Sequence, residues 1–250
     1  MSHYDFSAQR LFVEAPLAPG LAFVPPAEAL NYLLNVLRLR EGDAVLVFNG
    51  RDGEFLAVIA EATRRSAKLR VERMTRAQSK GADLDYCFAP LKQARLDYMA
   101  QKATEMGTGR LVPVITRRTQ VRKVNAARLR ANAVEAAEQC GILTVPDVLE
   151  AVELTDFLAA FPQERLLVFC DEDAAIANPY EALFEKKAQG VSLLIGPEGG
   201  FDDAERASIA RAPNVVTLSL GPRVLRADTA AVAALAILQA AIGDWRSNAL

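Results

Sequence analysis

The residues best suited to chemistry follow an apolar run at 193–195, in the segment 196–201 (GPEGGF), with acidic residues continuing to 205. Glycines at such a place let backbone N–H and C=O groups approach a ligand closely. The segment has neither the Gly-Lys-Ser/Thr of a phosphate-binding loop nor a GxGxxG pattern. Acidic residues at the start of the following helix also disfavour a bound phosphate there. The alternative to a ligand loop is a tight turn from a strand into a helix.

A second candidate is the segment 218–229 (LSLGPRVLRADT), where an apolar run again ends in a glycine, Gly221. Arg223 and Arg226 follow. Two arginines at a strand end are costly to bury without partners, so we expect them to face water or to bind a ligand. Asp228 and Thr229 then lead into an apolar helix, and either could simply be its N-cap.

The third candidate is basic. Residues 92–130 hold ten Lys or Arg and two acids, a local net charge of +8, whereas 131–213 hold sixteen acids and five bases, a local net charge of −11. A basic segment inside an acidic chain can be the footprint of a polyanion, and the alternative is a solvated surface balanced by the acidic one. The run 117–123 (RRTQVRK) follows a predicted strand end, where loops often bind ligands, and this favours function.

Composition excludes several classes of protein. The 250 residues carry a formal net charge of −2 and a single histidine, His3, which argues against Ser-His-Asp or Cys-His catalysis and against a His-rich metal site. Three cysteines, Cys87, Cys140 and Cys170, show no CxxC spacing and fit reduced, buried thiols of a cytoplasmic protein. We expect no secretory signal in 1–10. The most apolar helical stretch, 229–243, falls short of the roughly 20 residues that span a membrane.

The elements that must position these segments change character near residue 76. Before it, apolar runs at 44–48 and 54–59 flank a Gly-containing turn, which predicts a hairpin. A third strand is expected at 68–74. Leucines at helical spacing predict a helix over 26–39. Residues 1–75 are therefore expected to form a small β-barrel with one helix, and 76–80 a linker.

From residue 81 onward, strands and helices alternate. The apolar runs predict strands at 85–91, 111–116, 166–170, 192–195 and 215–220. The helical patterns fall at 94–106, 125–140, 179–189, 202–212 and 229–243. This alternation predicts an α/β domain over 81–250, with a parallel sheet flanked by helices on both faces.

Taken together, these segments carry a family resemblance. Residues 196–201 with 220–226 (LGPRVLR) are similar to the cofactor loops of the SPOUT methyltransferases. More narrowly, the chain resembles the RsmE family of 16S ribosomal RNA (uracil-N3)-methyltransferases along nearly its whole length. The matching motifs are 35–40 (NVLRLR), Gly42-Asp43, 48–50 (FNG), 101–107 (QKATEMG) and 135–139 (EAAEQ). The chain departs from the family pattern at Asn31 and Tyr32, where a histidine is common, and at Ala227-Asp228, where Thr-Glu is common.

The resemblance implies a PUA-like RNA-binding domain over 1–75 and a SPOUT methyltransferase domain over 81–250 with a deep trefoil knot. It further implies S-adenosyl-L-methionine as cofactor, held in a bent pose, and a homodimer. The expected activity is methylation of N3 of one uridine in 16S ribosomal RNA, free or in the small ribosomal subunit, in the cytoplasm. Neither a metal nor a membrane is implied.

The same resemblance suggests site residues. The cofactor would lie against Ile195, Gly196, Pro197, Gly199, Leu218, Leu220, Gly221, Arg223 and Leu225. RNA would contact Arg10, Arg38, Lys92, Arg117, Arg118 and Arg122. With no suitable histidine, a carboxylate, water or an RNA group must take the N3 proton, so Asp228 is the first candidate and Glu198 the second. Arg226 would stabilise charge that develops on the uracil oxygens.

Three alternatives remain open at this point. A SPOUT enzyme that methylates the ribose 2′-oxygen would use the same cofactor loops. A non-catalytic RNA-binding module would use the hairpin domain and the basic segment, without binding the cofactor. An enzyme acting on a small metabolite would fit if the basic segment has no role in binding.

Overall fold

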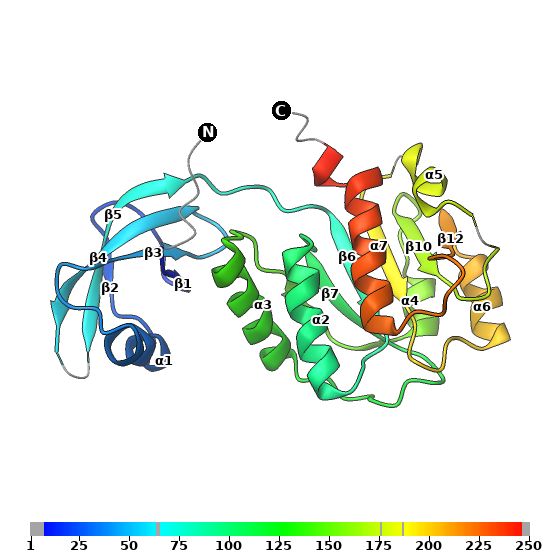
Figure 1. Cartoon of the computed structure of the whole chain (residues 1–250), viewed down its shortest axis with the longest axis horizontal. Coiled ribbons are helices and arrows are strands. Elements are labelled where there is room, and N and C mark those ends of the chain that lie inside the picture. The colour runs from blue at the N-terminus through cyan, green and yellow to red at the C-terminus, as the bar shows by residue number, and fades with distance from the viewer. Residues whose placement is uncertain (1–7, 64–65, 176, 187, 247–250) are drawn as a thin grey trace. The chain divides into compact units, whose positions relative to one another are not determined.

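The protein is described by a computed structural model that covers residues 8–63, 66–175, 177–186 and 188–246. His3 lies outside these residues. The chain divides into two compact units (Figure 1). The first runs to Lys80 and also takes in Ala137–Val145, and the second comprises Gly81–Ala136 and the chain from Pro146 onward. The domain boundaries expected from the sequence, 1–75 and 81–250, place the segment 137–145 in the C-terminal domain instead. These domain boundaries stay a prediction.

The first unit is built on a five-stranded sheet in the order β1-β3-β4-β5-β2. The strands are β1 (Arg10–Phe12), β2 (Ala22–Phe23), β3 (Ala44–Phe48), β4 (Glu54–Ala62) and β5 (Ala67–Arg76). The hairpin β3–β4 has the predicted position, and Asn49 closes its turn by accepting hydrogen bonds from the backbone N–H groups of Arg51 and Asp52. Alternate residues of β4 and β5 point into one buried apolar cluster, as half-buried strands require.

The predicted helix over 26–39 is shorter and less regular in the structure. It consists of α1 (Ala27–Asn31) followed by one turn of π-helix, η1 (Tyr32–Val36), and Arg38 ends it in the left-handed region with φ of 57°. The Asn31 side chain accepts a hydrogen bond from Asn35 at 2.8 Å, and the Tyr32 hydroxyl donates one to Gln9 at 3.2 Å. The two departures from the family pattern thus lie on the solvent-exposed side of this helix.

Glu54 is the charged centre of the first unit. Its carboxylate is only 2% exposed, accepts hydrogen bonds from Arg10 at 3.2 Å and Arg76 at 2.6 Å, and is bonded by the Thr75 hydroxyl at 2.8 Å. Arg10 is itself buried between Glu54 and the carbonyl of Ala8. The prediction that Arg10 contacts RNA is therefore wrong, because its guanidinium is committed to a buried ion pair.

The segment 137–145 completes a small apolar cluster of the first unit. Ala137 and Leu143 pack against Phe48, which meets Phe12 edge to face with ring centroids 5.5 Å apart. The Glu138 carboxylate accepts a hydrogen bond from the Phe12 backbone N–H at 2.7 Å, and Arg76 donates to the carbonyl of Gly141 at 2.9 Å. Residues distant in sequence thus belong to the same compact unit.

The second unit is an α/β sandwich, as predicted. Its sheet has the order β12-β10-β11-β6-β7-β8, with every pair parallel and β9 added beside β7. The strands are β6 (Leu84–Phe88), β7 (Arg110–Ile115), β8 (Asp147–Val148), β9 (Val152–Glu153), β10 (Leu166–Cys170), β11 (Val191–Ile195) and β12 (Val215–Leu218). The helices are α2 (Gln93–Glu105), α3 (Ala126–Cys140), α4 (Leu154–Ala159), α5 (Pro179–Phe184), α6 (Asp203–Ala210) and α7 (Ala227–Ala241). The end of α3, from Ala137 onward, belongs to the first unit. The short elements α4, β8 and β9 are not predicted from the sequence.

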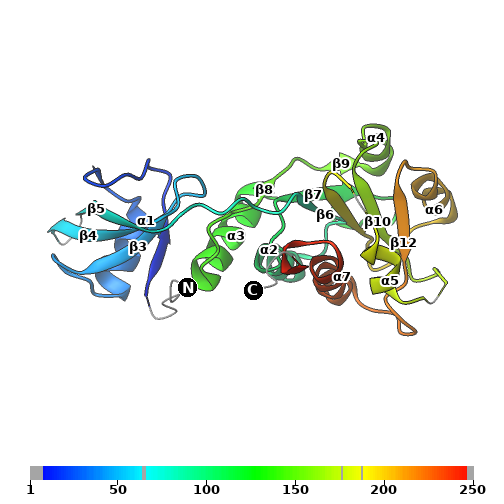
Figure 2. The ribbon, with the colours of Figure 1, turned by 90° about the horizontal axis from the view of Figure 1, so that it is seen from above.

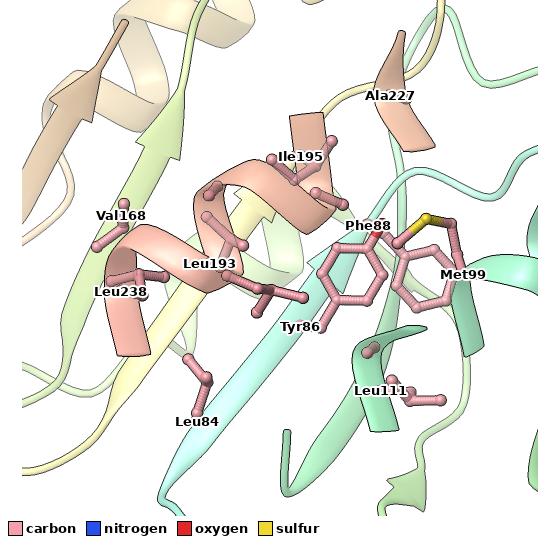
Figure 3. Close-up of a cluster of buried hydrophobic side chains, with 14 of the residues drawn as sticks. Leu84, Tyr86, Phe88, Met99, Leu111, Val168, Leu193, Ile195, Ala227 and Leu238 are labelled. Atoms are coloured by element: carbon pink, nitrogen blue, oxygen red, sulfur yellow. The ribbon is translucent and has the colours of Figure 1, made fainter. Parts of the chain in front are cut away.

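Helices cover both faces of this sheet because successive strand residues point in opposite directions (Figure 2). On one face, Tyr86, Leu193 and Ile195 pack with buried residues of α2, α5 and α7 (Figure 3). On the other face, Leu194 and Phe169 pack with residues of α4 and α6. The predicted parallel sheet flanked by helices is confirmed, whereas no observation tests the predicted trefoil knot.

The helix α7, together with the turn that follows it (Ala227–Arg246), is long and apolar enough to cross a membrane by length and composition alone. The core helix of a soluble protein satisfies the same test. Ala231, Ala234 and Leu235 are fully buried, and Leu238 is 1% exposed, all within the cluster on the sheet. This packing makes α7 a core helix of the second unit.

The ion pairs of Glu54 predict a measurable effect on stability. Replacing Glu54 by Gln removes the carboxylate from buried Arg10, and breaking a buried pair in this way costs about 3–5 kcal/mol. We expect Glu54→Gln to lower the free energy of urea unfolding and to accelerate hydrogen exchange of the β4 amides. The matched control is Glu61→Gln, on the same strand, whose exposed pair with Lys68 is 3.8 Å long and is expected to contribute about 0–1 kcal/mol. Equal losses for the two variants would contradict the assignment.

The same group predicts a pH dependence. Burial alone would raise the pKa of Glu54, but hydrogen bonds from Arg76 and Thr75 and the nearby Arg76 and Arg10 charges lower it below its ordinary value. The stability that this group contributes is therefore present above the ordinary pKa of glutamate and is lost as the pH falls through the lowered value of the folded state. Acid unfolding followed by circular dichroism should show this pH-dependent loss of stability in the wild type and lack it in Glu54→Gln. The same dependence of unfolding on pH in both proteins would refute the role of Glu54.

Candidate active site

A cavity of about 170 Å³ opens where β10, β11 and β12 end. Because these three strands are parallel neighbours, their carboxyl ends lie at the same edge of the sheet, where ligands bind in open α/β sheets. The loop after each strand and the first turns of α7 form the walls. The lining residues are Cys170–Glu172, Ile195–Pro197, Gly200, Leu218–Leu225, Ala227 and Ala230.

The loop after β11 is shaped by close packing. The ring of Phe201 occupies the place where a side chain at residue 196 would lie, 2.5 Å from an ideal Cβ. Phe201 is buried and meets Phe169 edge to face. The glycine at 196 is thus required by the packing of Phe201 and not only by the approach of a ligand, which is a reason that the sequence analysis does not anticipate.

The loop then enters α6 through a capping box. Asp202 accepts a hydrogen bond from the backbone N–H of Glu205 at 2.8 Å, and Glu205 accepts one from that of Asp202 at 3.1 Å. These bonds satisfy donors that would otherwise be open at the helix N-terminus. The start of α6 is thus capped by the chain's own carboxylates, and the absence of a bound phosphate there stays a prediction.

The loop after β12 has an open glycine. Gly221 has a φ of +102°, a conformation that residues with a side chain rarely adopt, and no atom lies within 4 Å of where its Cβ would be. Its missing side chain therefore leaves space in the cavity. The helix α7 begins at Ala227, two residues earlier than predicted, with Arg226 as N-cap and without a side-chain capping bond. Neither Asp228 nor Thr229 is the cap.

The loop after β10 supplies acidic residues that the sequence analysis did not select. The carboxylates of Asp171, Glu172 and Asp173 lie within 4.8 Å of one another, a spacing that could suit a metal ion. The guanidinium of Arg206 bonds all three, at 3.1, 2.7 and 2.6 Å. Burial alone would lower the pKa of Arg206, but these carboxylates raise it, so a permanent cation offsets part of the negative charge of the cluster.

The predicted catalytic carboxylates come together at one arginine. Arg95, in the first turn of α2, donates a hydrogen bond to Glu198 at 3.3 Å and lies 3.9 Å from Asp228. Asp228 also accepts a bond from the backbone N–H of Thr229 at 3.0 Å. Burial, and next the charge of Asp228, raise the pKa of the Tyr86 phenol, which therefore stays protonated. Arg95 is a residue that the sequence analysis missed.

The predicted RNA-binding arginines on the loop after β7 are exposed, and each also contacts a neighbouring group of the protein. Arg117 bonds Asp202 at 2.8 Å and is 70% exposed, Arg118 donates to the carbonyl of Gly199 at 2.6 Å, and Arg122 pairs with Glu153 at 2.5 Å. Lys92, the N-cap of α2, and Arg38 of the first unit are exposed. Much of the +8 segment therefore orients loops, while several N–H groups remain directed to solvent.

The cysteines fit the expected structural role. Burial raises the pKa of Cys170, which lines the cavity, to about 12, and burial likewise raises the pKa of Cys87. Neither thiol supplies a thiolate nucleophile at neutral pH. Cys140 is exposed, contrary to the expectation that each cysteine is buried.

Of the nine residues predicted to contact a cofactor, eight line the cavity and one, Gly199, does not. Its neighbour Gly200 lines the cavity in its place. The lining also includes residues that sequence reasoning did not select, namely Cys170–Glu172, Gly200, Ser219, Pro222, Val224, Ala227 and Ala230. The run of three acidic residues, Asp171 to Asp173, directly after an apolar strand is the sequence feature that could have indicated this loop.

Comparison with known proteins defines the class. Residues 78–239 match the family described as RNA methyltransferase domain, and residues 25–72 match the RNA methyltransferase PUA domain. The chain is thus built as an RNA methyltransferase preceded by a PUA domain, as the resemblance implied.

The individual relatives narrow this class. The ribosomal RNA small subunit methyltransferase E of Rickettsia conorii is 33% identical over 83% of this chain and 84% of its own length. The methyltransferase E of Neisseria gonorrhoeae, whose crystal structure is bound to S-adenosyl methionine, superposes with a TM-score of 0.84 at 25% identity, covering 93% of this chain and 97% of the other. A Legionella pneumophila methyltransferase with bound cofactor gives 0.79 at 29% identity, over 94% and 98%. This chain belongs to the ribosomal RNA small subunit methyltransferase E family.

The open space at Gly221 predicts how a side chain at this position would affect cofactor binding. A valine at this position directs its side chain into open space beside the lining residues, so we expect Gly221→Val to reduce the affinity for S-adenosylmethionine by at least tenfold, about 1.4 kcal/mol. Isothermal calorimetry with the cofactor alone measures this loss.

The control for backbone strain is Gly20→Val. Gly20 also has a positive φ, of +87°, and open space at its Cβ, but it lies in a turn of the first unit. Gly20→Val should lower the free energy of unfolding by about as much as Gly221→Val does, and it should leave the affinity for the cofactor unchanged. Wild-type affinity in a folded Gly221→Val protein would show that this glycine does not border the cofactor.

Proposed function

We propose that this protein transfers the methyl group of S-adenosylmethionine to N3 of one uridine in 16S ribosomal RNA. One observation carries the proposal: the cavity at the carboxyl ends of β10, β11 and β12 has the two candidate carboxylates, Glu198 and Asp228, on the segments that border it. Relatives that share this fold over nearly the whole chain bind S-adenosyl methionine in their crystal structures.

The lining suits such a cofactor. Leu218, Leu220 and Leu225 offer an apolar surface for an adenine ring, and the open position at Gly221 lets polar backbone groups reach the ligand. Asp171 and Glu172 add negative charge to the rim, which favours a ligand that carries an ammonium and a sulfonium. When bound, the cofactor supplies an electrophilic methyl group.

The protein must also remove a proton. N3 of uracil carries a hydrogen, and the nitrogen attacks only once this proton has left or is leaving. We assign the role of acceptor to Asp228, with Glu198 as the second candidate. Oδ1 of Asp228 accepts a bond from the Thr229 backbone N–H and its Oδ2 lies 3.9 Å from Arg95 Nε, while Oε1 of Glu198 accepts a bond from Arg95. Arg226, exposed at the N-cap of α7, stabilises the negative charge that develops on the uracil oxygens.

The substrate and assembly complete the proposal. N3 lies on the base-pairing edge, so the uridine must be unpaired or flipped out of its helix. Arg38, Lys92, Arg117, Arg118 and Arg122 contact the RNA backbone of the 16S RNA, free or in the small subunit. The protein acts in the cytoplasm as a homodimer, and its reaction requires no metal ion because the cofactor itself supplies the electrophilic methyl group.

The decisive experiment uses labelled S-adenosylmethionine with small and large ribosomal subunits that lack the modification. We expect label in the small-subunit RNA only, and mass spectrometry of digested RNA should place it on N3 of a uracil. Label on a ribose 2′-oxygen would favour the alternative SPOUT specificity. RNA binding without cofactor binding in calorimetry would favour a non-catalytic module.

Asp228→Asn tests the proton acceptor. Asparagine keeps the size of the side chain and removes its charge, and Asp228 does not cap α7. We expect the single-turnover methylation rate to fall by about 100-fold or more, in the range of acid–base groups, with cofactor affinity near wild type. Asp203→Asn, in the first turn of α6, is the control because it also removes a carboxylate from a helix start. A wild-type rate for Asp228→Asn would eliminate Asp228 as the acceptor.

The basic loop has its own test. Replacing Arg117, Arg118 and Arg122 by alanine should weaken RNA binding and reduce the slope of log K against log salt by roughly 0.7–0.9 per lost phosphate contact. Cofactor affinity should persist. Arg211→Ala, an exposed arginine after α6, is the control and should leave the slope unchanged. If the triple variant keeps the wild-type slope, the loop serves only to pair with Asp202, Gly199 and Glu153.

A further inference from the structure

Arg95 links three parts of the second unit that are far apart in the sequence. It belongs to the first turn of α2, Glu198 to the loop after β11, and Asp228 to the first turn of α7. Its Nη1 donates to Glu198 Oε1 at 3.3 Å and its Nε lies 3.9 Å from Asp228 Oδ2. Both candidate proton acceptors are thereby held on one guanidinium.

The place of Arg95 is not one that helix stability favours. The N-terminal end of a helix carries partial positive charge, so a cation there is disfavoured, and α2 has no acidic residue in its first turn to offset it. The side chains of Arg95 and Glu198 are 39% and 37% exposed, and ion pairs this exposed contribute little to folding. The pairing of Arg95 with Glu198 and Asp228 is therefore not explained by a contribution to folding stability.

Asp228 is the more enclosed of the two acids. Its side chain is 19% exposed against 37% for Glu198, and its charge contributes to the raised pKa of the buried Tyr86 phenol. Glu198 lies on an exposed turn of the loop that borders the cavity through Gly196, Pro197 and Gly200. Without a common partner, the two negatively charged carboxylates would repel each other, and the more exposed Glu198 would turn to solvent.

We propose that Arg95 is a positioning residue for methyl transfer: it holds Glu198 and Asp228 together at the rim of the cavity, so that the acceptor carboxylate faces the uracil N3–H. This inference rests on the proposed function. A planar guanidinium can address two carboxylates at once from different edges, which a lysine ammonium does less well. Arg95 acts through the carboxylates and need not touch the RNA itself.

The test compares Arg95→Ala and Arg95→Lys with the wild-type protein in single-turnover methylation at saturating RNA and cofactor. We expect Arg95→Ala to lower the rate constant by about 10- to 100-fold, the range expected when a reacting group is misplaced by about 1 Å. Arg95→Lys, which keeps the charge, should recover part of the rate. Cofactor affinity should remain near wild type in both, because Arg95 does not line the cavity.

A double-mutant cycle separates positioning from general stabilisation. If Arg95 acts through the acids, Arg95→Ala should have a smaller effect in a Glu198→Gln or Asp228→Asn background than in the wild type. Arg128→Ala is the matched control. Arg128, on α3, also pairs with a residue of α2, Asp97 at 2.7 Å, but no pair joins it to Glu198 or Asp228 in the described structure. It should leave the rate unchanged.

The outcomes distinguish this inference from the proposed function. A wild-type protein that labels no RNA overturns both. An active wild type with an equally active Arg95→Ala variant overturns the role of Arg95 alone. Weaker RNA binding in Arg95→Ala with an unchanged rate at saturating RNA would make Arg95 a phosphate contact, and fully additive effects in the cycle would likewise refute positioning.

Discussion

Parallel pairing of β12, β10, β11 and β6 is the constraint on which the second unit depends. Parallel neighbours end at the same edge, so three loops that lie far apart in the chain must converge there. At the opposite edge, the buried Arg165 fixes the strand starts by bonding Ser192 at 2.8 Å and Asp83 at 2.6 Å, while Ser192 donates to Asp85 at 3.0 Å. These bonds hold the starts of β10, β11 and β6 together, at the end of the strands opposite the cavity.

Arginines then set the shape of the converging loops. Arg206 gathers the acids after β10, Arg117 ties the loop after β7 to Asp202, and Arg95 joins Glu198 to Asp228. Each guanidinium offers several N–H groups in a fixed plane, so it can bind a loop and still present donors to solvent. Part of the excess of basic residues in 92–130 therefore serves as an internal scaffold.

Glycines in the two candidate loops show that one residue type can serve two purposes. The glycine at 196 accommodates the ring of Phe201, whereas Gly221 adopts a positive φ and leaves its Cβ position open to the cavity. The first is a requirement of the core and the second a requirement of the site. In the first unit, Arg10 shows the same contrast: its charge suggests RNA, but its burial against Glu54 assigns it to the interior.

The sequence by itself determined the class of fold and the alternation of strands and helices, because apolar periodicity is a local signal. Its motifs also indicated the family, and eight of the nine residues that they suggested for the cofactor line the cavity. Only the tertiary structure decided that Arg10 is buried, that Ala137–Val145 belongs to the first unit, that Arg226 rather than Asp228 caps α7, and that Arg95 meets both acids. The burial of Arg10, the place of Ala137–Val145 and the position of Arg95 depend on contacts between residues far apart in the chain, up to 133 positions from Arg95 to Asp228. Such contacts arise from packing that no local pattern records.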